Sequence, residues 1–494
     1  MASNTPKAAE KPSLRRNFML NSVLTASSIM FLLVSFPYVS RVLLDEGVGK
    51  VAFATSLVSY FAMLGQLGIP TYGVRACAMV RDDKEALSRT AQELLIIHAV
   101  MSAVSYALFL IALVAIPRLR EEKALYLIIS STIFFQTIGM EWLYKAIEEY
   151  RYITIRSVIF KGIAMVAMLL LVKSQDDYMI YGGLTIFAAS ASNALNFIHA
   201  RKHIFLKPLG GYHFRRHWKP VMIFFAMACA TTIYVHLDTV MLGWITTDAE
   251  VGCYEAALKT RGALASMVTA LGAVVLPRAS YFARQGRYNE LWSISRKAMS
   301  FIFLLATPLT VYFILFARDT LLVLSGISFL RAVPAMRVIM PTLLLVGITN
   351  VLGLQILVPL GRERVVLHSE IAGAVTDLAL NMLLIPRLGA TGAAVGTLAA
   401  EAVVLAVQYQ ALKGEVREIF HDFRYGRLLA AIMAGIAASL WVTVCHWNSL
   451  LSIIVAAVLF FGAYGLVLLK TGEPLAEEAY AQSKRLILQW FRKE

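Results

Sequence analysis

The sequence predicts an all-α membrane protein that crosses the bilayer about fourteen times. Hydrophobic residues make up 59% of its 494 positions and charged residues only 16%, unlike the composition of a soluble protein. Apolar runs of more than about 18 residues, long enough to span a bilayer, recur along the whole chain. Lys and Arg, which give a net charge of +15, gather between these runs. The positive charge therefore indicates membrane topology and not nucleic-acid binding.

The predicted transmembrane helices follow directly from the apolar runs. They cover residues 17–40, 51–74, 91–117, 124–147, 152–172, 178–200, 220–245, 251–277, 298–317, 333–360, 365–386, 389–412, 428–446 and 449–469. With this set, about 33 of the 46 Lys and Arg residues lie on the side of the two termini. Cytoplasmic loops are enriched in Lys and Arg, so both termini are expected in the cytoplasm.

The sequence contains no arrangement of residues that is typical of an enzyme active site or a metal site. The four cysteines lie in or beside apolar runs, and no CxxC or Cys/His spacing typical of a zinc site is found. The sequence also lacks a nucleophile–base arrangement and a glycine loop that could hold phosphates. We therefore expect a transporter and not an enzyme, with no cofactor and no metal beyond Na⁺ as a coupling ion.

An internal repeat organises the chain. The stretch DEGVGKVAFATSL begins at Asp45, and DAEVGCYEAALKT begins at Asp248, six predicted helices later. A third similar stretch, LGATGAAVGTLAAE, begins at Leu388. Because an even number of helices separates the first two stretches, they form a parallel repeat related by an axis along the membrane normal. Such duplications are typical of transporters, whose substrate sites lie between the repeats.

Charged side chains inside predicted spans are the strongest indication of function. Asp238 and Lys259 lie on opposite sides of the turn near residue 248, each about 15 Å along its helix, so they can form an ion pair. Arg261 is two residues beyond Lys259, about 200° around the helix, and cannot meet the same acid. Burying charge in a membrane is costly, so the remaining cation requires a cavity or an anionic ligand.

A second set of polar side chains lies at matching depth on the eleventh and twelfth predicted helices. Asp377 and Glu401 are the acids, with Asn381 and Thr397 one helical turn away from them. Such an oxygen-rich cluster suits Na⁺ or a shuttled proton as coupling ion. The alternative is a buried network between helices in which one acid stays protonated.

One further pair of opposite charges is predicted within the first half of the chain. Glu141 and Lys161 lie on consecutive predicted helices and are expected to form a structural ion pair. His98 and His236 are isolated histidines in apolar runs, for which packing is the default interpretation.

Four stretches of the sequence are similar to a known family. They are PYVSRVLLDEGVGKVAFATSLVSYFAMLGQLGIPTYGVRACAMVRDDKEALS at 37–88, EWLYKAIEEYRYITIRSVIFK at 141–161, LDTVMLGWITTDAEVGCYEAALKTRG at 237–262 and NMLLIPRLGATGAAVGTLAAEAV at 381–403. They resemble blocks of the bacterial Wzx-like polysaccharide flippases, in the polysaccharide transport family of the MOP superfamily. This resemblance implies two six-helix lobes in a V-shaped, MATE-like arrangement and two further C-terminal helices.

The domain organisation expected from the spans and the resemblance has six parts. They are a cytoplasmic tail at 1–16, an N-terminal lobe at 17–207, a cytoplasmic linker at 208–219, a C-terminal lobe at 220–413, transmembrane helices 13 and 14 at 425–470, and an amphipathic cytoplasmic tail at 474–494.

The resemblance also implies a function. Flippases of this group move undecaprenyl-diphosphate-linked oligosaccharides across the inner membrane by alternating access, for O-antigen, capsule or exopolysaccharide synthesis. The diphosphate would be bound by the cations Arg41, Arg75, Lys259 and Arg261. A related flippase places a cation site on the seventh, eleventh and twelfth helices. This would use Asp238, Asp377 and Thr397, and would compete with the Asp238–Lys259 pair.

The expected partners are the lipid-linked oligosaccharide, membrane lipids, and a polysaccharide polymerase with other glycan-assembly proteins. We expect a monomer in the bacterial inner membrane, driven by Na⁺, H⁺ or the membrane potential. Two other functions fit the same fold: a cation-coupled multidrug exporter and a non-transporting scaffold. An exporter would prefer an acidic first lobe, yet residues 17–40 contain no acid. A scaffold has no evident use for the buried charges.

Overall fold

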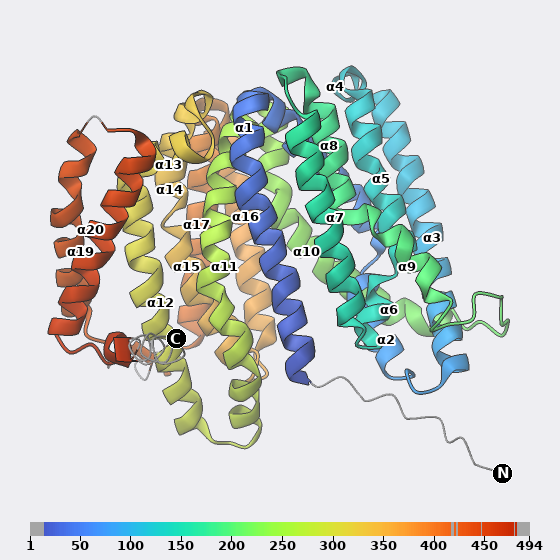
Figure 1. Ribbon diagram of the computed structural model, residues 1–494. Coiled ribbons are helices and arrows are strands. Elements are labelled where there is room, and N and C mark those ends of the chain that lie inside the picture. Colours follow the sequence, from blue (N-terminus) through green and yellow to red (C-terminus); the bar gives the residue numbers. More distant parts are fainter. Residues whose placement is uncertain (1–13, 416–418, 421–422, 446, 479, 482–494) are drawn as a thin grey trace, which may run out of the picture. The chain divides into compact units, whose positions relative to one another are not determined.

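A computed structural model of the chain is entirely helical in its regular elements over the residues that it describes. These are all residues except 1–13, 416–418, 421–422, 446, 479 and 482–494. Most of the predicted N-terminal tail at 1–16 and most of the predicted amphipathic C-terminal tail lie outside the described residues, and α1 already begins at Leu14. The all-α fold class predicted from the sequence is confirmed (Figure 1).

The helices of the first half run as far as α10 (Figure 1). They are α1 Leu14–Gln66, α2 Ile69–Ala78, α3 Lys84–Ala115, α4 Pro117–Glu121, α5 Lys123–Gly139, α6 Glu141–Ala146, α7 Tyr150–Leu171, η1 Gln175–Asp177, α8 Tyr178–Ile186, η2 Phe187–Ala191, α9 Asn193–Ala200 and α10 Arg215–Ile245.

The helices of the second half begin with α11. They are α11 Asp248–Arg284, α12 Tyr288–Leu315, α13 Ala317–Leu324, η3 Ile327–Ala332, α14 Val333–Ile339, α15 Thr342–Asn350, η4 Val351–Leu357, α16 Glu363–Leu388, α17 Ala390–Ala411, α19 Tyr425–Ser439, η5 Leu440–Val444 and α20 Ser449–Lys470.

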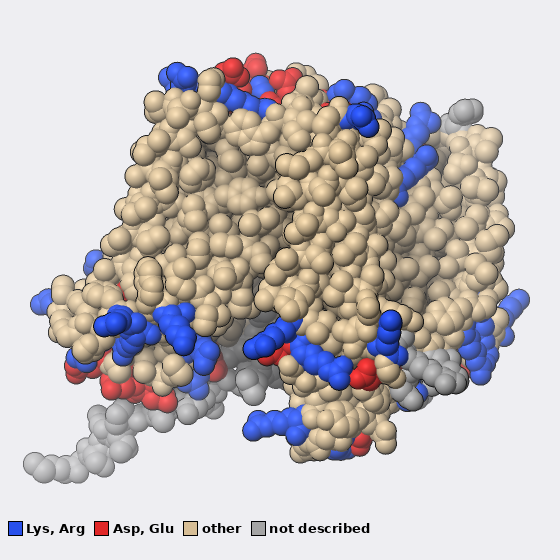
Figure 2. Space-filling model, turned by 180° about the vertical axis from the view of Figure 1, so that it is seen from behind, with Lys and Arg blue, Asp and Glu red and all other residues tan. Residues whose placement is uncertain are grey.

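The prediction of a membrane protein with many transmembrane helices is confirmed, and the exact number of fourteen spans stays a prediction. Among the described residues, nine helices are long and apolar enough to cross a membrane, or up to eleven if two bent pairs each count as one span. Each predicted range contains helix, but several are interrupted. The range 124–147, for example, breaks at Met140, which has a φ of 43°. On the face shown in Figure 2, Lys and Arg side chains gather toward the top and the bottom of the view, and the broad surface between them carries few charged residues.

The break after α5 is stabilised by a buried polar contact. A helix end leaves backbone carbonyl groups without partners, and burying them unpaired is costly. The buried amide of Asn196 donates a 2.6 Å hydrogen bond to the carbonyl oxygen of Gly139, the last residue of α5. Tyr144 in α6 in turn donates to the carbonyl oxygen of Asn196 at 2.5 Å. The sequence therefore contains the side chains that make an interrupted helix stable.

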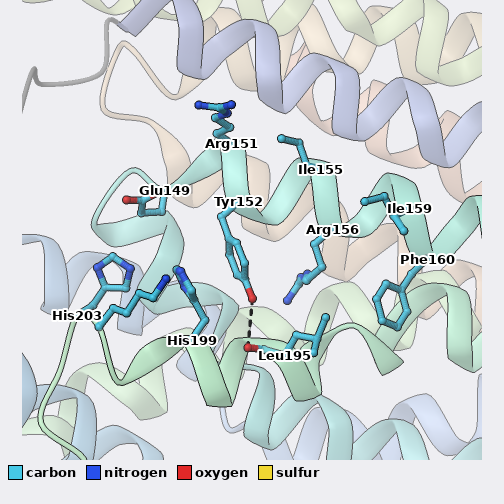
Figure 3. A pocket seen from close by; sticks show the side chains of 11 residues that line it. Glu149, Arg151, Tyr152, Ile155, Arg156, Ile159, Phe160, Leu195, His199 and His203 are labelled. Carbon is cyan, nitrogen blue, oxygen red and sulfur yellow. Dashed lines mark hydrogen bonds between the residues drawn. The ribbon is translucent and has the colours of Figure 1, made fainter.

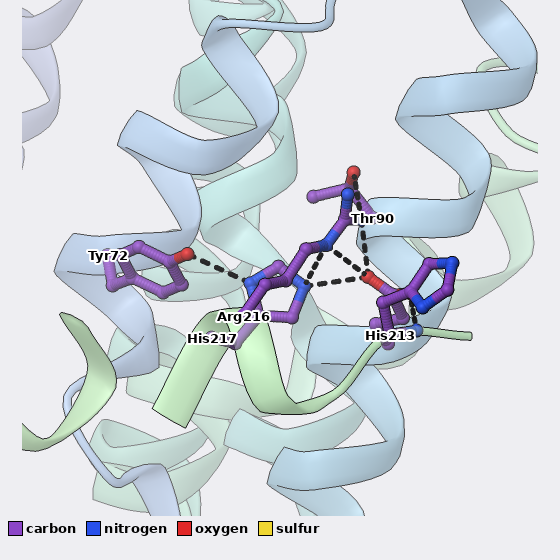
Figure 4. A network of polar contacts seen from close by, with 6 residues as sticks. Tyr72, Thr90, His213, Arg216 and His217 are labelled. Carbon is purple, nitrogen blue, oxygen red and sulfur yellow. Dashed lines mark hydrogen bonds and ion pairs between the residues drawn. The ribbon is translucent and has the colours of Figure 1, made fainter. Parts of the chain in front are cut away.

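The loop before α10 is anchored by a buried acid. Glu93 of α3 is fully buried and accepts a hydrogen bond from the backbone N–H of His213 at 2.6 Å. Its other oxygen lies 2.5 Å from the Arg216 guanidinium and 2.7 Å from the His217 ring (Figure 4). These contacts fix the start of α10 on α3.

The chain divides into two compact units. The first contains Met1–Leu43 and Lys50–Leu237, and the second contains Leu44–Gly49 and Asp238–Glu494. The boundary falls inside α10, beyond the predicted linker at 208–219. Asp238, where the second unit resumes, forms its hydrogen bonds with α11, α16 and α17, as described below.

The repeated turns predicted from the sequence contact each other within the second unit. A Cβ atom added to Gly49 would lie 1.7 Å from the carbonyl oxygen of Asp248, and one added to Gly252 would lie 1.9 Å from that of Asp45. The contact is reciprocal, with each glycine of one repeat lying against the acid of the other. Both repeats therefore need glycine here because the backbones approach too closely for any side chain.

The third repeat-like stretch joins the same region. The carboxylate of Glu250 accepts a 2.8 Å hydrogen bond from the backbone N–H of Ala390, at the start of α17. Gly389 precedes it with a φ of 53°, and a Cβ atom there would lie 2.3 Å from the Glu250 carboxylate. An acid at a helix N-terminus is electrostatically favourable, so Glu250 positions α17 relative to α11.

Candidate functional site

The candidate coupling site lies in the second unit, where two closely packed helices meet α10 and α11. Small residues allow α16 and α17 to approach each other: a Cβ atom on Gly373 would lie 2.6 Å from Val404, and one on Gly392 would lie 2.6 Å from the carbonyl oxygen of Leu384. Close helix pairs in membranes commonly have small residues at their contact. The packing brings the polar side chains of both helices together.

Asp238 is the centre of this site. One of its carboxylate oxygens accepts a 2.7 Å hydrogen bond from the Asn381 amide, and the other accepts a 2.8 Å hydrogen bond from the Thr397 hydroxyl. The hydroxyl of Tyr254 also donates to Asp238 and lies 3.0 Å from that of Thr397. Asp238 is 6% exposed, so these donors replace water around a buried carboxylate.

Asp377 completes the site with an unsatisfied oxygen. It is 2% exposed and interacts with Asp238 and Asn381. Its Oδ1 atom and the Oδ1 atom of Asn381 are buried and have no hydrogen-bond partner among the described residues. Both oxygens lie against Gly396, where an added Cβ atom would lie 2.9 Å and 2.3 Å from them, respectively. Unpaired oxygens beside two carboxylates are suited to a cation or a proton.

The sequence prediction for this site is partly corrected. Asp238, Asn381, Thr397 and Asp377 are brought together by hydrogen bonds, whereas Glu401 influences Asp377 electrostatically. Its carboxylate lies 3.3 Å from the Arg261 guanidinium, which also donates a 2.9 Å hydrogen bond to the Thr342 hydroxyl. The acid that forms a hydrogen bond with Asp377 is therefore Asp238, while Glu401 forms an ion pair with Arg261.

The predicted ion pair between Asp238 and Lys259 is wrong. Lys259 forms an ion pair of 3.2 Å with Glu255, one turn earlier on α11, while the oxygens of Asp238 are taken up by hydroxyl and amide donors. Asp238 and Lys259 lie at matching depth along their helices, but Lys259 pairs with Glu255 because that acid is nearer on the same helix. Sequence reasoning also missed Tyr254, although a tyrosine flanked by Cys253, Glu255 and small residues on α11 was a usable signal.

Another correction concerns the ion pair predicted between Glu141 and Lys161. Glu141 lies 3.4 Å from Lys145, four residues later on the same helix. Lys161 donates hydrogen bonds to Ser27 at 3.3 Å and Ser28 at 2.6 Å on α1, and Glu141 acts on it only as a nearby charge. The short i, i+4 spacing favours the local partner over the one on the next helix.

The four predicted phosphate-binding cations belong to both units. Arg41 in α1 is exposed and donates a 2.6 Å hydrogen bond to the carbonyl oxygen of Pro37. Arg75 in α2 is also exposed. Lys259 and Arg261 belong to the second unit, and each has an acid beside it, as described above.

A polar pocket of about 230 Å³ in the first unit was not predicted. Gln66 donates a 2.5 Å hydrogen bond to Gln136 across it, and the His236 ring on its wall lies 3.2 Å from the Ser56 hydroxyl. The expectation that His236 serves only packing is therefore incomplete, because one side of it faces this pocket. Amide, hydroxyl and imidazole groups are suited to hydrogen bonding with hydroxyl-rich ligands.

No group of three or more His, Cys, Asp or Glu side chains that could hold a metal ion is found in the described part of the chain. At the Asp238 site, a Na⁺ ion would instead be held by carboxylate oxygens together with the amide oxygen of Asn381 and the hydroxyl oxygen of Thr397. These are the oxygen ligands that hard cations prefer.

Comparisons with known proteins agree with the architecture. The family model described as "Polysaccharide biosynthesis protein" matches residues 14–283. A "Putative O-antigen transporter" of Escherichia coli (strain K12) is 22% identical over 400 residues, covering 80% of this chain and 95% of the relative.

Two solved transporters share the fold. The structure "Lipid II flippase MurJ, inward closed conformation" matches with a TM-score of 0.70 and 12% identity, over 92% of this chain and 99% of that one. An inward-facing multidrug resistance MATE family transporter of the MOP superfamily matches with a TM-score of 0.64 and 13% identity, over 83% of this chain and 100% of that one. The chain therefore shares the fold of these two structures, as its sequence predicts.

Proposed function

Because the chain belongs to the polysaccharide biosynthesis protein family, we propose that it is a flippase for undecaprenyl-diphosphate-linked oligosaccharide repeat units. It moves them from the cytoplasmic to the periplasmic leaflet for synthesis of a surface polysaccharide such as O-antigen, capsule or exopolysaccharide. The O-antigen transporter relative and the lipid II flippase fold support this cargo. The protein is a multi-pass membrane transporter and not an enzyme.

The observation that carries this proposal is the pair of cations inside α11. Lys259 and Arg261 lie within 3.3 Å of the acids Glu255 and Glu401, respectively. A diphosphate carries about two negative charges and forms strong hydrogen bonds with ammonium and guanidinium groups. Charges attract more strongly in a cavity of low dielectric constant than in water, so the phosphates can replace the acids during transport.

The sugar part of the cargo requires a different kind of surface. The polar pocket of the first unit offers Gln66, Gln136 and His236 as hydrogen-bonding groups. Amides bind sugar hydroxyl groups as donors and as acceptors. The lipid tail stays in the bilayer while the head group crosses, as the fold opens alternately to the two sides.

The cycle is coupled to a cation at the Asp238 site. Asp238, Asp377, Asn381 and Thr397 supply the oxygens that would hold Na⁺ or exchange a proton. A bound cation neutralises the repulsion between the two neighbouring carboxylates. Because occupancy changes the stability of this contact between α10, α16 and α17, it can favour one state of the second unit over another.

The protein works in the bacterial inner membrane with both termini in the cytoplasm, since Lys and Arg are concentrated on that side. It acts as a monomer beside a polysaccharide polymerase and other glycan-assembly proteins. An inside-negative potential assists the outward movement of an anionic head group, by about 2.3 kcal/mol per uncompensated charge at 100 mV.

Liposomes that contain the purified protein and a fluorescent diphosphate-linked glycan test the proposal. The expected result is protein-dependent movement of the glycan between leaflets, abolished by at least one of Arg41→Gln, Lys259→Gln and Arg261→Gln. Arg284→Gln, which removes an exposed cation near the end of α11, is the matched control and should transport normally. Normal transport by all three Gln variants would contradict the cationic mechanism.

A multidrug exporter is the second candidate, because a MATE transporter shares the fold. The same liposomes distinguish the two functions. Efflux of a cationic dye without movement of the glycan would favour the exporter.

A further inference from the structure

A second pocket of the first unit lies between α7 and α9 and shares no residue with the candidate sites described above. Its volume is about 600 Å³, within the range of about 300–1,000 Å³ that ligand pockets occupy. Figure 3 shows Tyr152 and Arg156 directed from α7 toward α9. The Tyr152 hydroxyl donates a 3.1 Å hydrogen bond to the carbonyl oxygen of Leu195, which holds the two helices together at this point.

Arg156 is the feature of the pocket that indicates an anionic ligand. It is 6% exposed, and its Nη1 atom donates a 3.1 Å hydrogen bond to the carbonyl oxygen of Ser192. Its Nε atom is buried and has no hydrogen-bond partner among the described residues. Glu141 acts on it electrostatically but forms its ion pair with Lys145. A buried guanidinium without a carboxylate partner is costly, and an anion in the pocket would offset that cost.

The rest of the polar wall adds positive charge and donors. Arg151 and Lys202 line the pocket with Arg156, against one acid, Glu149, so cations exceed acids by two. The Nε2 atom of His203 is also buried without a partner in the described part of the chain. Burial lowers the pKa of His203, so this ring is neutral at pH 7 and can donate an N–H without adding charge.

The other wall of the pocket is apolar and continues along α7. Ile155 and Ile159 line the pocket, and Ile163, Val166 and Leu170 follow on the same face of the helix. All five side chains are about half exposed or more. From the first to the last they extend about 22 Å, which exceeds one leaflet of a hydrocarbon core about 30 Å thick. A cationic pocket thus opens onto an apolar track as long as a lipid chain.

We propose that this pocket binds an anionic phospholipid of the cytoplasmic leaflet. The phosphate lies beside Arg156 and Lys202, and one acyl chain lies along α7 from Ile155 to Leu170. Basic pockets between transmembrane helices on the cytoplasmic side are typical sites for anionic lipid head groups. The lipid is a resident ligand of the first unit and is not the transported cargo.

Two features favour a phospholipid over other phosphate compounds. A free phosphate would make no use of the apolar track on α7. The transported glycan would need many hydrogen-bonding groups for its sugars, whereas this pocket is lined in part by the apolar side chains Ile155, Ile159, Phe160 and Leu195. The amide-rich pocket around Gln66 is better suited to sugars.

The test uses the full-length protein, purified in detergent and stripped of lipid. Dioleoylphosphatidylglycerol, dioleoylphosphatidylcholine, short-chain dihexanoylphosphatidylglycerol and inorganic phosphate are added separately. Native mass spectrometry counts the bound lipids, and the midpoint of thermal unfolding reports stabilisation. We expect the long-chain anionic lipid to bind at least tenfold more tightly than the other three and to raise the midpoint.

Variants locate the binding. Lys202→Gln changes an exposed side chain of the pocket, so the protein should fold normally and bind the lipid at least fivefold more weakly. Arg201→Gln removes the neighbouring exposed cation, which does not line the pocket, and should leave binding unchanged. Arg156→Gln should abolish the remaining binding.

Three outcomes would overturn the proposal. Equal binding of the zwitterionic lipid would remove the role of the cations. Equal binding of inorganic phosphate would make the pocket a phosphate site. Displacement of the phospholipid by an undecaprenyl-diphosphate-linked glycan would make the pocket part of the transport route. Glycan transport is measured separately, so failure of the lipid site leaves the proposed flippase activity intact.

Discussion

The ion pair between Arg261 and Glu401 allows a structural role of a buried cation to be separated from a role in substrate binding. The two side chains are 17% and 7% exposed and lie 3.3 Å apart, and Thr342 accepts a further hydrogen bond from Arg261. Three variants are informative: Arg261→Gln, Glu401→Gln, and the double replacement. If Arg261 serves only to neutralise Glu401, the double variant should be fully functional.

The expected loss of unfolding free energy depends on which buried charge remains without its partner in each variant. Arg261→Gln leaves a carboxylate that is almost fully buried without its cation, which costs about 3–5 kcal/mol. Glu401→Gln keeps an oxygen that can accept from Arg261 and should cost less, about 1.5–3 kcal/mol. In the double variant two neutral amides face each other and neither buried charge remains. Its unfolding free energy should therefore recover to within about 1 kcal/mol of the wild type.

The midpoint of thermal unfolding in detergent measures the stability, and flipping in liposomes measures the transport. We expect the double variant to unfold near the wild-type midpoint and to transport at less than one tenth of the wild-type rate, because the charge that binds phosphate is missing. A stable double variant that transports normally would refute the role of Arg261 in binding. A double variant as unstable as Arg261→Gln would refute the proposed pairing.

Three further predictions concern coupling, packing and topology. Asp377→Asn, which mimics a protonated acid, should yield folded protein whose transport no longer responds to a Na⁺ or pH gradient. Wild-type transport indifferent to both gradients would exclude coupling at this site. Gly49→Ala puts a Cβ atom 1.7 Å from the carbonyl oxygen of Asp248, so it should cost about 1–3 kcal/mol and lower the unfolding midpoint, whereas an unchanged midpoint would contradict this close contact. Pro208→Cys, in a variant without the native cysteines, should react with an impermeant thiol reagent only from the cytoplasmic side, and labelling only from the periplasm would overturn the topology.

The positions of the helices along the chain were predictable because each transmembrane segment must be apolar by itself. A span requires a long apolar run whatever the other helices do, so each predicted range contains helix in the structure. Interruptions were harder to predict. The break between α5 and α6 depends on Asn196, which lies more than fifty residues beyond it and satisfies the carbonyl of Gly139.

The composition of the candidate coupling site was also largely predictable. Ionisable and amide side chains are rare in apolar runs, so Asp377, Asn381 and Thr397 were identified by type and depth. Asp238 was assigned to this site only through the family resemblance, because its depth suggested Lys259 as its partner. Tyr254 was missed because a tyrosine in a span more often serves packing.

The sequence by itself determined the membrane class, the approximate helix positions, the repeat, and which buried side chains carry charge. Only the tertiary structure decided their partners. Depth along a helix follows from the rise per residue, but contact also depends on the direction in which each side chain points and on which helices are neighbours. Lys259 therefore forms an ion pair with Glu255, and Glu141 with Lys145, each one turn away on the same helix. Asp238 instead accepts hydrogen bonds from side chains of α16 and α17. The lipid pocket likewise exists only because α7 and α9 lie side by side, leaving Arg156 buried between them.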